Sequence, residues 1–246
     1  MGNLLTVNNT TYLSGKPWPY DEAQRWCTFE LYPSWIGERH DVYEGLTYAK
    51  NDKYTETRQE IVVKTKAHLP DDWTAYLDCH IEATTLARRF NKSAAHLSGV
   101  KIIFADAVIS QMCDVSDIMK ITKLLRLSRR NPHDDENVLV EEYLKGDFVH
   151  FSSEWGETKC SNCELLEAFT HFTHQETHGQ LVICNLKGIF INGCYKLTNP
   201  TIHSSTGHFG YKDYGTAGIS EVYRNHSCNL ICNELGLPRK KNKEKD

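Results

Sequence analysis

The residues best suited to hold a metal ion lie near the C-terminus of this 246-residue chain. His226, Cys228 and Cys232 follow one another with the spacing H-x-C-x3-C. On a helix, cysteines four apart share one face about a turn apart, and a histidine at the helix start can reach the same point. Two thiolates and an imidazole are three of the four ligands of a tetrahedral structural zinc site. The spacing therefore predicts zinc, with the fourth ligand supplied from elsewhere.

The fourth ligand has several candidates upstream. An apolar pattern of helical period predicts a helix there, from which His171 and His174 project. Just before it, Cys160 and Cys163 form a CxxC pair, which could bind a second metal, compete for the first, or simply be two loop thiols. The apolar residues that define the predicted helix are Leu165, Leu166, Ala168, Phe169 and Phe172.

Composition indicates an ordinary globular protein. The chain is 40% hydrophobic and 24% charged, and its net charge of −4 gives no reason to expect a nucleic-acid partner. Nine cysteines without an N-terminal apolar segment favour reduced thiols and a cytoplasmic location. No apolar run is long enough to cross a membrane. The start Met1-Gly2-Asn3-Leu4-Leu5-Thr6 fits the N-myristoylation pattern, which would add a weak membrane contact through Gly2.

The elements that must position these residues can be read from periodicity. A β-branched run predicts a strand over 60–68, and apolar residues at helical spacing predict a helix over 74–96. Further strands are expected at 100–104, 107–109 and 138–140, with a polar surface loop at 128–137. Strands and helices together predict an α+β fold.

Five sequence blocks then resemble the alpha-kinase family, which includes elongation factor 2 kinase, the myosin heavy chain kinases and the TRPM channel kinases. They occur in the family's order and at similar separations. The blocks are AFTHFTH at 168–174, GQLVICNLKG at 179–188, LTNPTIHS at 197–204, FGYKDYGTAG at 209–218 and HSCNLICNELGLP at 226–238.

The resemblance implies a bilobal, atypical alpha-type protein kinase fold with a zinc-stabilised C-lobe. Its expected parts are an N-terminal extension over 1–34, one alpha-kinase-like domain over 35–238 and a basic tail over 239–246. Within the domain we expect an N-lobe to about 140, a hinge at 140–146 and a C-lobe over 147–238. The implied zinc ligands are His171, His226, Cys228 and Cys232. Binding by Cys160 and Cys163 instead would make the His171 assignment wrong.

The resemblance also implies a site for ATP or ADP. Lys64 matches the family lysine that reaches the phosphates; the alternative is a solvated lysine on the outer face, beside Lys66. Glu141, Glu142 and Leu144 match the hinge that binds the adenine and its sugar. The nucleotide would lie between Lys64, this hinge and Asn185.

Two glycine-bearing segments match functional loops of the family. Residues 35–45 match a loop that covers the nucleotide phosphates, although a plain hairpin turn would explain the same glycines. Gly210, Asp213 and Gly215 lie in the segment that helps to hold a peptide substrate, where Asp213 replaces the commoner asparagine.

The chain departs from the family pattern at its catalytic positions. Asn185 and Asn199 stand where the pattern has its metal-binding and catalytic aspartates, and Lys187 replaces a glutamine. Asparagine keeps a carbonyl oxygen but loses the negative charge and the capacity to accept a proton. Because Mg²⁺ in kinase sites is held by carboxylates and phosphates, Mg²⁺ is doubtful here. Lys187 either neutralises the phosphates in place of the metal or points to solvent.

We therefore predict a nucleotide-binding pseudokinase or severely impaired Ser/Thr kinase that acts through a protein partner or protein substrate. The alternative is an active atypical Ser/Thr protein kinase with rearranged catalytic groups, for which Asp213 or Glu221 could substitute.

Overall fold

The structure, a computed structural model, describes residues 9–12, 24–37, 39–50, 56–66, 73–97, 99–115, 133 and 135–238. Gly2, the basic tail and most of the loop expected at 128–137 lie outside these residues. The chain forms two compact units: the first combines Met1–Trp73 with Asp106–Tyr143, and the second combines Thr74–Ala105 with Leu144–Asp246. The chain therefore enters the second unit twice, in place of the single N-lobe to C-lobe boundary expected near residue 140.

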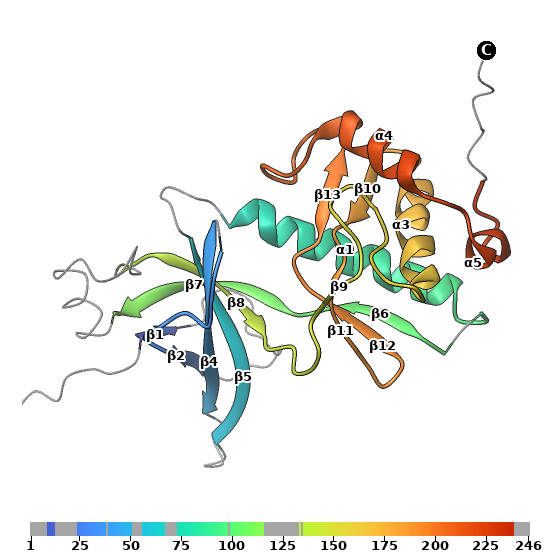
Figure 1. Ribbon diagram of the computed structural model, residues 1–246. Coiled ribbons are helices and arrows are strands. Elements are labelled where there is room, and N and C mark those ends of the chain that lie inside the picture. The colour runs from blue at the N-terminus through green and yellow to red at the C-terminus, as the bar shows by residue number, and fades with distance from the viewer. Residues whose placement is uncertain are drawn as a thin grey trace, which may run out of the picture. The chain divides into compact units, whose positions relative to one another are not determined.

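The first unit is built on a seven-stranded antiparallel sheet in the order β2-β1-β7-β8-β5-β4-β3 (Figure 1). Because β2 also pairs with β4, six of these strands form a closed ring. Part of the expected N-terminal extension thus belongs to the sheet. The strands are β1 (Asn9–Tyr12), β2 (Gln24–Phe29), β3 (Trp35–Ile36), β4 (His40–Lys50), β5 (Glu56–Lys66), β7 (Ala107–Asp114) and β8 (Asn137–Glu142).

Strand alternation explains what the ring encloses. Ile61 and Val63 of β5 point into its apolar core, so Lys64 points to the opposite face. Gly45 pairs with Phe29 where β4 meets β2, and a side chain there would collide with the β2 backbone. The glycine segment expected to cover phosphates is a β3–β4 hairpin, in which the Gly37 amide donates to the His40 carbonyl at 3.0 Å.

The second unit contains a four-stranded sheet in the order β6-β12-β11-β9 and a separate two-stranded β10–β13 sheet (Figure 1). Within the described residues, no helix is long and apolar enough to span a bilayer. The elements are α1 (Thr74–Ser93), β6 (Lys101–Phe104), β9 (Val149–His150), α3 (Glu164–Glu176), β10 (Leu181–Cys184), β11 (Lys187–Ile191), β12 (Cys194–Leu197), β13 (Thr201–Ser204), α4 (Gly215–Asn225) and α5 (Leu230–Glu234).

All four residues of β10 are buried because helices cover both faces of the β10–β13 pair. Leu181 and Ile183 join the main core with α3, whereas Val182 and Cys184 pack with α4. On the α1 side of that core, Phe90 lies edge-on to rings of α3. The expected helical pattern over 74–96 thus produced a helix that packs on α3 and β6.

Candidate functional site

Four metal-type ligands converge in the second unit. One ligand atom from each of His171, His226, Cys228 and Cys232 lies within 4.8 Å of all the others. Cys228 Sγ is 3.7 Å from His171 Nδ1, and Cys232 Sγ is 3.6 Å from His226 Nε2. Tetrahedral zinc, with bonds of about 2.3 Å to sulfur and about 2.0 Å to nitrogen, separates such ligands by about 3.6 Å. The donor set and its spacing therefore fit zinc.

The elements that bring these ligands together differ from those expected. His171 projects from α3, and Cys232 lies on α5. Cys228 precedes α5 and His226 caps the end of α4, so the expectation of one helix carrying both cysteines is wrong. Asn229 fixes the connection: its side chain accepts from the Cys232 amide at 3.1 Å and donates to the α3 backbone.

Burial shifts the pKa values of two cluster residues. Burial, with help from His226 and His174, lowers the pKa of His171 to about 4, so its imidazole is neutral and able to ligate. Burial also raises the pKa of Cys232 to about 11, so a thiolate there needs a nearby positive charge. The His171 Nε2 atom is buried.

The second cysteine pair is not part of this cluster. Cys160 and Cys163 are joined by a disulfide, and the other seven cysteines, all among the described residues, form none. In this structure the pair is therefore neither a metal site nor two loop thiols, and it leaves His171 as the fourth member of the cluster.

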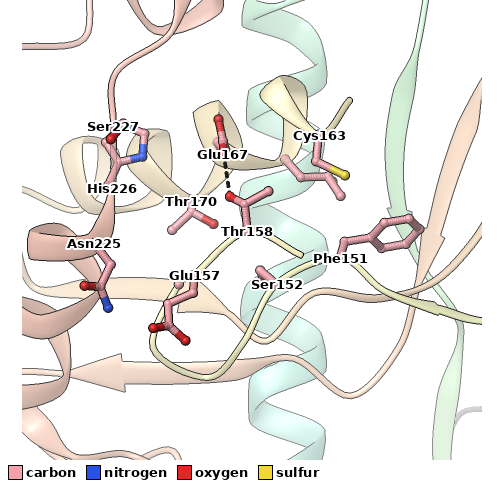
Figure 2. A pocket seen from close by; sticks show the side chains of 12 residues that line it. Phe151, Ser152, Glu157, Thr158, Cys163, Glu167, Thr170, Asn225, His226 and Ser227 are labelled. Atoms are coloured by element: carbon pink, nitrogen blue, oxygen red, sulfur yellow. Dashed lines mark hydrogen bonds between the residues drawn. The ribbon is translucent and has the colours of Figure 1, made fainter. Parts of the chain in front are cut away.

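A cavity of about 310 Å³ lies beside the cluster, between the 151–158 segment, α3 and residues 225–227 (Figure 2). Its lining includes the carboxylates of Glu157 and Glu167 but no lysine or arginine. Such a lining is unsuited to phosphate, and no sequence motif had indicated this cavity.

Asn185 and Asn199 lie at the same end of the β10–β13 pair. Asn185 directly follows β10, Asn199 lies two residues before β13, and the register pairs Cys184 with Thr201. The antiparallel pairing therefore brings together the two positions that sequence reasoning treated as degenerate catalytic residues.

Both asparagines have left-handed backbones, with φ of 54° at Asn185 and 47° at Asn199. Asn and Asp are the residues other than glycine that adopt this conformation most readily, so either would keep these turns. The side-chain amide of Asn185 donates to Thr201 Oγ1 at 3.1 Å. The backbone N–H of Asn199 donates to Nε2 of His80 on α1 at 3.3 Å.

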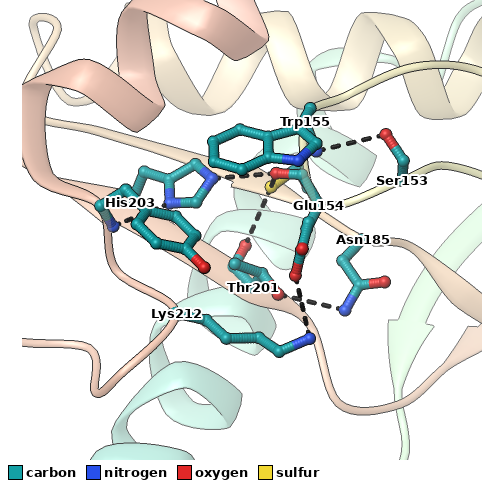
Figure 3. Close-up of polar contacts among 9 residues, drawn as sticks. Ser153, Glu154, Trp155, Asn185, Thr201, His203 and Lys212 are labelled. Atoms are coloured by element: carbon teal, nitrogen blue, oxygen red, sulfur yellow. Dashed lines mark hydrogen bonds and ion pairs between the residues drawn. The ribbon is translucent and has the colours of Figure 1, made fainter.

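The charged groups around Asn185 were missed by sequence reasoning. Glu154 and Lys212 form an ion pair of 2.9 Å beside Asn185 and Thr201 (Figure 3). Glu154 lies outside the motifs considered, and Lys212 is inside the glycine-bearing block but had no assigned role. Lys187 instead begins β11, opposite His150, whose pKa is lowered by burial and then by Lys187.

Asp213 holds the glycine-bearing segment in shape. Its carboxylate accepts from Ser204 N at 2.7 Å, Ser204 Oγ at 2.6 Å, Phe209 N at 3.1 Å and Gly215 N at 3.0 Å. Burial alone would raise the pKa of Asp213, but these hydrogen bonds outweigh it and lower the pKa. Gly210 and Gly215 have positive φ, as the turn requires.

The two proposed substitute carboxylates are therefore engaged elsewhere. Asp213 is used by four backbone and hydroxyl donors, and Glu221 pairs with Arg224 one turn along α4. The Arg224 hydrogen bond lowers the pKa of Glu221, which makes it a weak base. Neither residue is well suited to replace a catalytic aspartate.

In the first unit, Lys64 and Glu141 form a buried ion pair of 2.6 Å. The β5–β8 register sets Lys64 opposite Leu139 and Val62 opposite Glu141, so the two charges are diagonal neighbours on one face. Lys64 is 6% exposed, which makes the solvated reading wrong. Glu142 ends β8 half-buried, and Leu144 begins the next segment of the second unit.

Part of this chain is similar to known protein kinases. The alpha-protein kinase vwkA of Dictyostelium discoideum is 28% identical over 166 residues, covering 65% of this chain and 24% of that protein. Human eukaryotic elongation factor 2 kinase is 33% identical over 100 residues, covering 40% and 13% respectively. The chain thus spans about a quarter or less of these relatives.

Solved structures show the fold. The alpha-kinase domain of myosin-II heavy chain kinase A superposes with a TM-score of 0.71 at 16% identity, covering 97% of this chain and 99% of that one. An alpha kinase from Entamoeba histolytica gives 0.70 at 22% identity, covering 99% and 96%. The heavy chain kinase domain has been crystallised with ADP, with AMP-PNP and, as an inactive aspartate-to-alanine variant, with ATP.

The fold is therefore that of an atypical, alpha-type protein kinase. The alpha-kinase family model matches residues 37–232, most of the described chain. This chain belongs to the alpha-kinase family.

Proposed function

We propose that this alpha-kinase domain binds an adenine nucleotide but has lost metal-dependent phosphate transfer, and acts through contacts with other proteins. The observation that carries the proposal is the pair Asn185 and Asn199, which keep the shape of two adjacent turns without supplying a charge. Losing one preorganised electrostatic group costs on the order of 10²- to 10³-fold in rate, and here two carboxylates of the family pattern are replaced together.

Nucleotide binding is supported by two separate observations. Lys64 is buried and paired with Glu141, and in the sequence resemblance it matches the family's phosphate-binding lysine. In myosin heavy chain kinase A, an inactive domain was obtained in complex with ATP, so nucleotide binding and activity are separable in that relative. We assign Lys64, Glu141, Glu142 and Leu144 to nucleotide binding on this basis.

We also propose a structural zinc ion held by His171, His226, Cys228 and Cys232. The ion would connect α3 to α5 and to the segment between α4 and α5. Because the ligands come together only in the folded chain, the binding free energy of the metal would stabilise the fold.

An active kinase is the second candidate, and Glu154 is the observation that favours it. Its carboxylate lies beside Asn185 and could supply part of the missing charge (Figure 3). The two candidates differ in whether the unmodified chain transfers phosphate.

The test combines binding with transfer. We expect ATP to raise the melting temperature with or without Mg²⁺, and radiolabelled ATP to leave no label on the domain or on generic Ser/Thr substrates. The alpha-kinase domain of myosin heavy chain kinase A serves as the positive control. Transfer by the unmodified chain that Lys64→Ala abolishes would overturn the proposal and favour the active kinase.

A further inference from the structure

Charge balance at Asn185 suggests a role for Lys212. Where the alpha-kinase pattern has two aspartates, one Mg²⁺ brings the local charge to zero. Here both aspartates are asparagines, and the charged pair labelled at the site is Glu154 with Lys212 (Figure 3). One carboxylate and one ammonium sum to zero, so this pair is neutral without a metal.

The Glu154 segment is firmly attached to the Asn185 turn. The backbone N–H of Asn185 donates to the backbone carbonyl of Ser153 at 2.9 Å. The Glu154 carbonyl accepts from Cys184 Sγ at 3.0 Å and lies 2.9 Å from His203 Nε2. Next to it, the Trp155 ring stacks on His203 and on Tyr214, with centroids 5.7 and 4.9 Å away. The Glu154 carboxylate is thus anchored through its own backbone.

The ammonium is held in place from the other side. Lys212 immediately precedes Asp213, whose four hydrogen bonds fix the turn. Burial, the largest single influence, would lower the pKa of Lys212, but the hydrogen bond to Glu154 and the electrostatic attraction of Glu154, Tyr211 and Tyr214 together outweigh it and raise the pKa. The lysine therefore remains charged. The Lys212 side chain is 38% exposed, so it borders solvent from which an anion could approach.

A divalent metal does not fit this arrangement. The nearby amide oxygen of Asn185 is uncharged, and the Glu154 carboxylate beside it is paired with Lys212. Mg²⁺ dehydrates reluctantly and is usually held by one or two carboxylates together with substrate phosphates. A cation entering here would have to displace an ammonium that is covalently attached to the chain.

We propose that Lys212 is a tethered cation that takes the place of the divalent metal at Asn185, neutralising Glu154 and presenting its remaining N–H donors to phosphate oxygens. The proposal rests on the proposed nucleotide binding. It reassigns to Lys212 the role that the sequence had suggested for Lys187. An ammonium has three donors, so one can serve Glu154 while the others serve a phosphate.

The first test does not involve nucleotide. Terbium, a hard cation that prefers oxygen ligands, should be sensitised by the neighbouring Trp155 when it binds at Glu154. We expect no such signal from the unmodified chain and saturable luminescence from Lys212→Met, because the carboxylate is then free. Adding Glu154→Gln, or Trp155→Phe, should abolish the signal, whereas Glu157→Gln in the same segment should not. Equal luminescence with and without Lys212 would overturn the proposal.

The second test uses ATP in the presence of EDTA. We expect the unmodified chain to bind ATP without metal, and Lys212→Met to bind it about tenfold more weakly, with Mg²⁺ recovering part of the loss. Lys187→Met is the matched control and should bind like the unmodified chain. An equal loss for Lys187→Met, or none for Lys212→Met, would overturn the proposal. If no variant binds ATP, the proposed nucleotide function fails, and the terbium result still decides whether Lys212 occupies the cation position.

Discussion

Nζ of Lys64 lies 2.6 Å from Oε2 of Glu141, and these residues are only 6% and 1% exposed. Two charges removed from water in this way depend on each other. Replacing both by apolar groups of similar size is often harmless, whereas removing one leaves an uncompensated buried charge. A variant that replaces both residues should therefore keep the fold stable and show whether Lys64 also binds nucleotide.

We expect Lys64→Met to lower the free energy of unfolding by about 3–5 kcal/mol. The double variant Lys64→Met/Glu141→Leu should recover most of that loss. Urea denaturation measures both effects. Calorimetry with ATP should detect binding to the unmodified chain but not to the stable double variant. Unchanged ATP affinity in the double variant would refute the assignment of these residues to the nucleotide.

The proposed zinc site predicts how much zinc the protein contains and how its removal changes thermal stability. Elemental analysis should give about one zinc per chain, and a strong chelator should lower the melting temperature. Cys228→Ser and Cys232→Ser should lose the metal and stability together, because each removes one of four ligands. Cys194→Ser, at a half-buried thiol of β12, is the matched control.

The same measurement distinguishes the alternative ligands. Cys160→Ser and Cys163→Ser should retain zinc, since the structure places neither in the cluster. Zinc loss in these variants, with zinc kept by His171→Ala, would show that the cluster is wrongly assigned.

The four hydrogen bonds that the Asp213 carboxylate accepts predict a pH dependence of stability. Its folded pKa lies below the ordinary value of 3.8, so its contribution is present above that value and is lost as the pH falls through the folded pKa. Asp213→Asn should cost about 1–3 kcal/mol at neutral pH, because the amide turns a donor toward groups that need an acceptor. The cost should shrink in acid.

Denaturation of both proteins between pH 7 and pH 3 checks this prediction. Asp147→Asn, at an exposed carboxylate, should leave the unfolding free energy nearly unchanged throughout. A cost for Asp213→Asn that does not vary with pH would show that ionisation of Asp213 contributes nothing.

Restoring the family's carboxylates should restore metal affinity. Asn185→Asp and Asn199→Asp, combined with Lys187→Gln and Lys212→Met, should bind Mn²⁺, because two carboxylates are then added beside Glu154 and the competing ammonium is gone. The turns should tolerate the change, since Asp accepts left-handed φ and can accept a hydrogen bond from Thr201.

Electron paramagnetic resonance measures Mn²⁺ binding, and radiolabelled ATP measures transfer. We expect metal binding first and weak transfer second, and any transfer should disappear with Lys64→Met/Glu141→Leu. The same variant retaining Lys212 should bind Mn²⁺ more weakly. A folded restored variant without Mn²⁺ affinity would mean that factors other than these charges disable the site.

Local patterns in the sequence were sufficient for several elements and residues. The apolar repeat that predicted α1 and the β-branched run that predicted β5 both produced those elements, because periodicity within a short window determines which face is buried. The spacing of His226, Cys228 and Cys232 indicated a metal cluster, and the structure brings these residues together with His171. Asn185 and Asn199 were visible as departures from the family pattern by sequence alone.

Tertiary structure decided everything that depends on register between distant segments. The pairing of β2 with both β1 and β4 closes a ring, and the β5–β8 register joins Lys64 to Glu141 across 77 positions. The ion pair of Glu154 with Lys212 beside Asn185 depends on two sets of hydrogen bonds. One attaches the loop that contains Glu154 to the end of β10, and the other, accepted by Asp213, shapes the loop that contains Lys212. No short window of sequence contains both partners of such a contact, because it is selected by packing of the whole unit. The sequence therefore identified which residues could do chemistry, and the fold determined which of them meet.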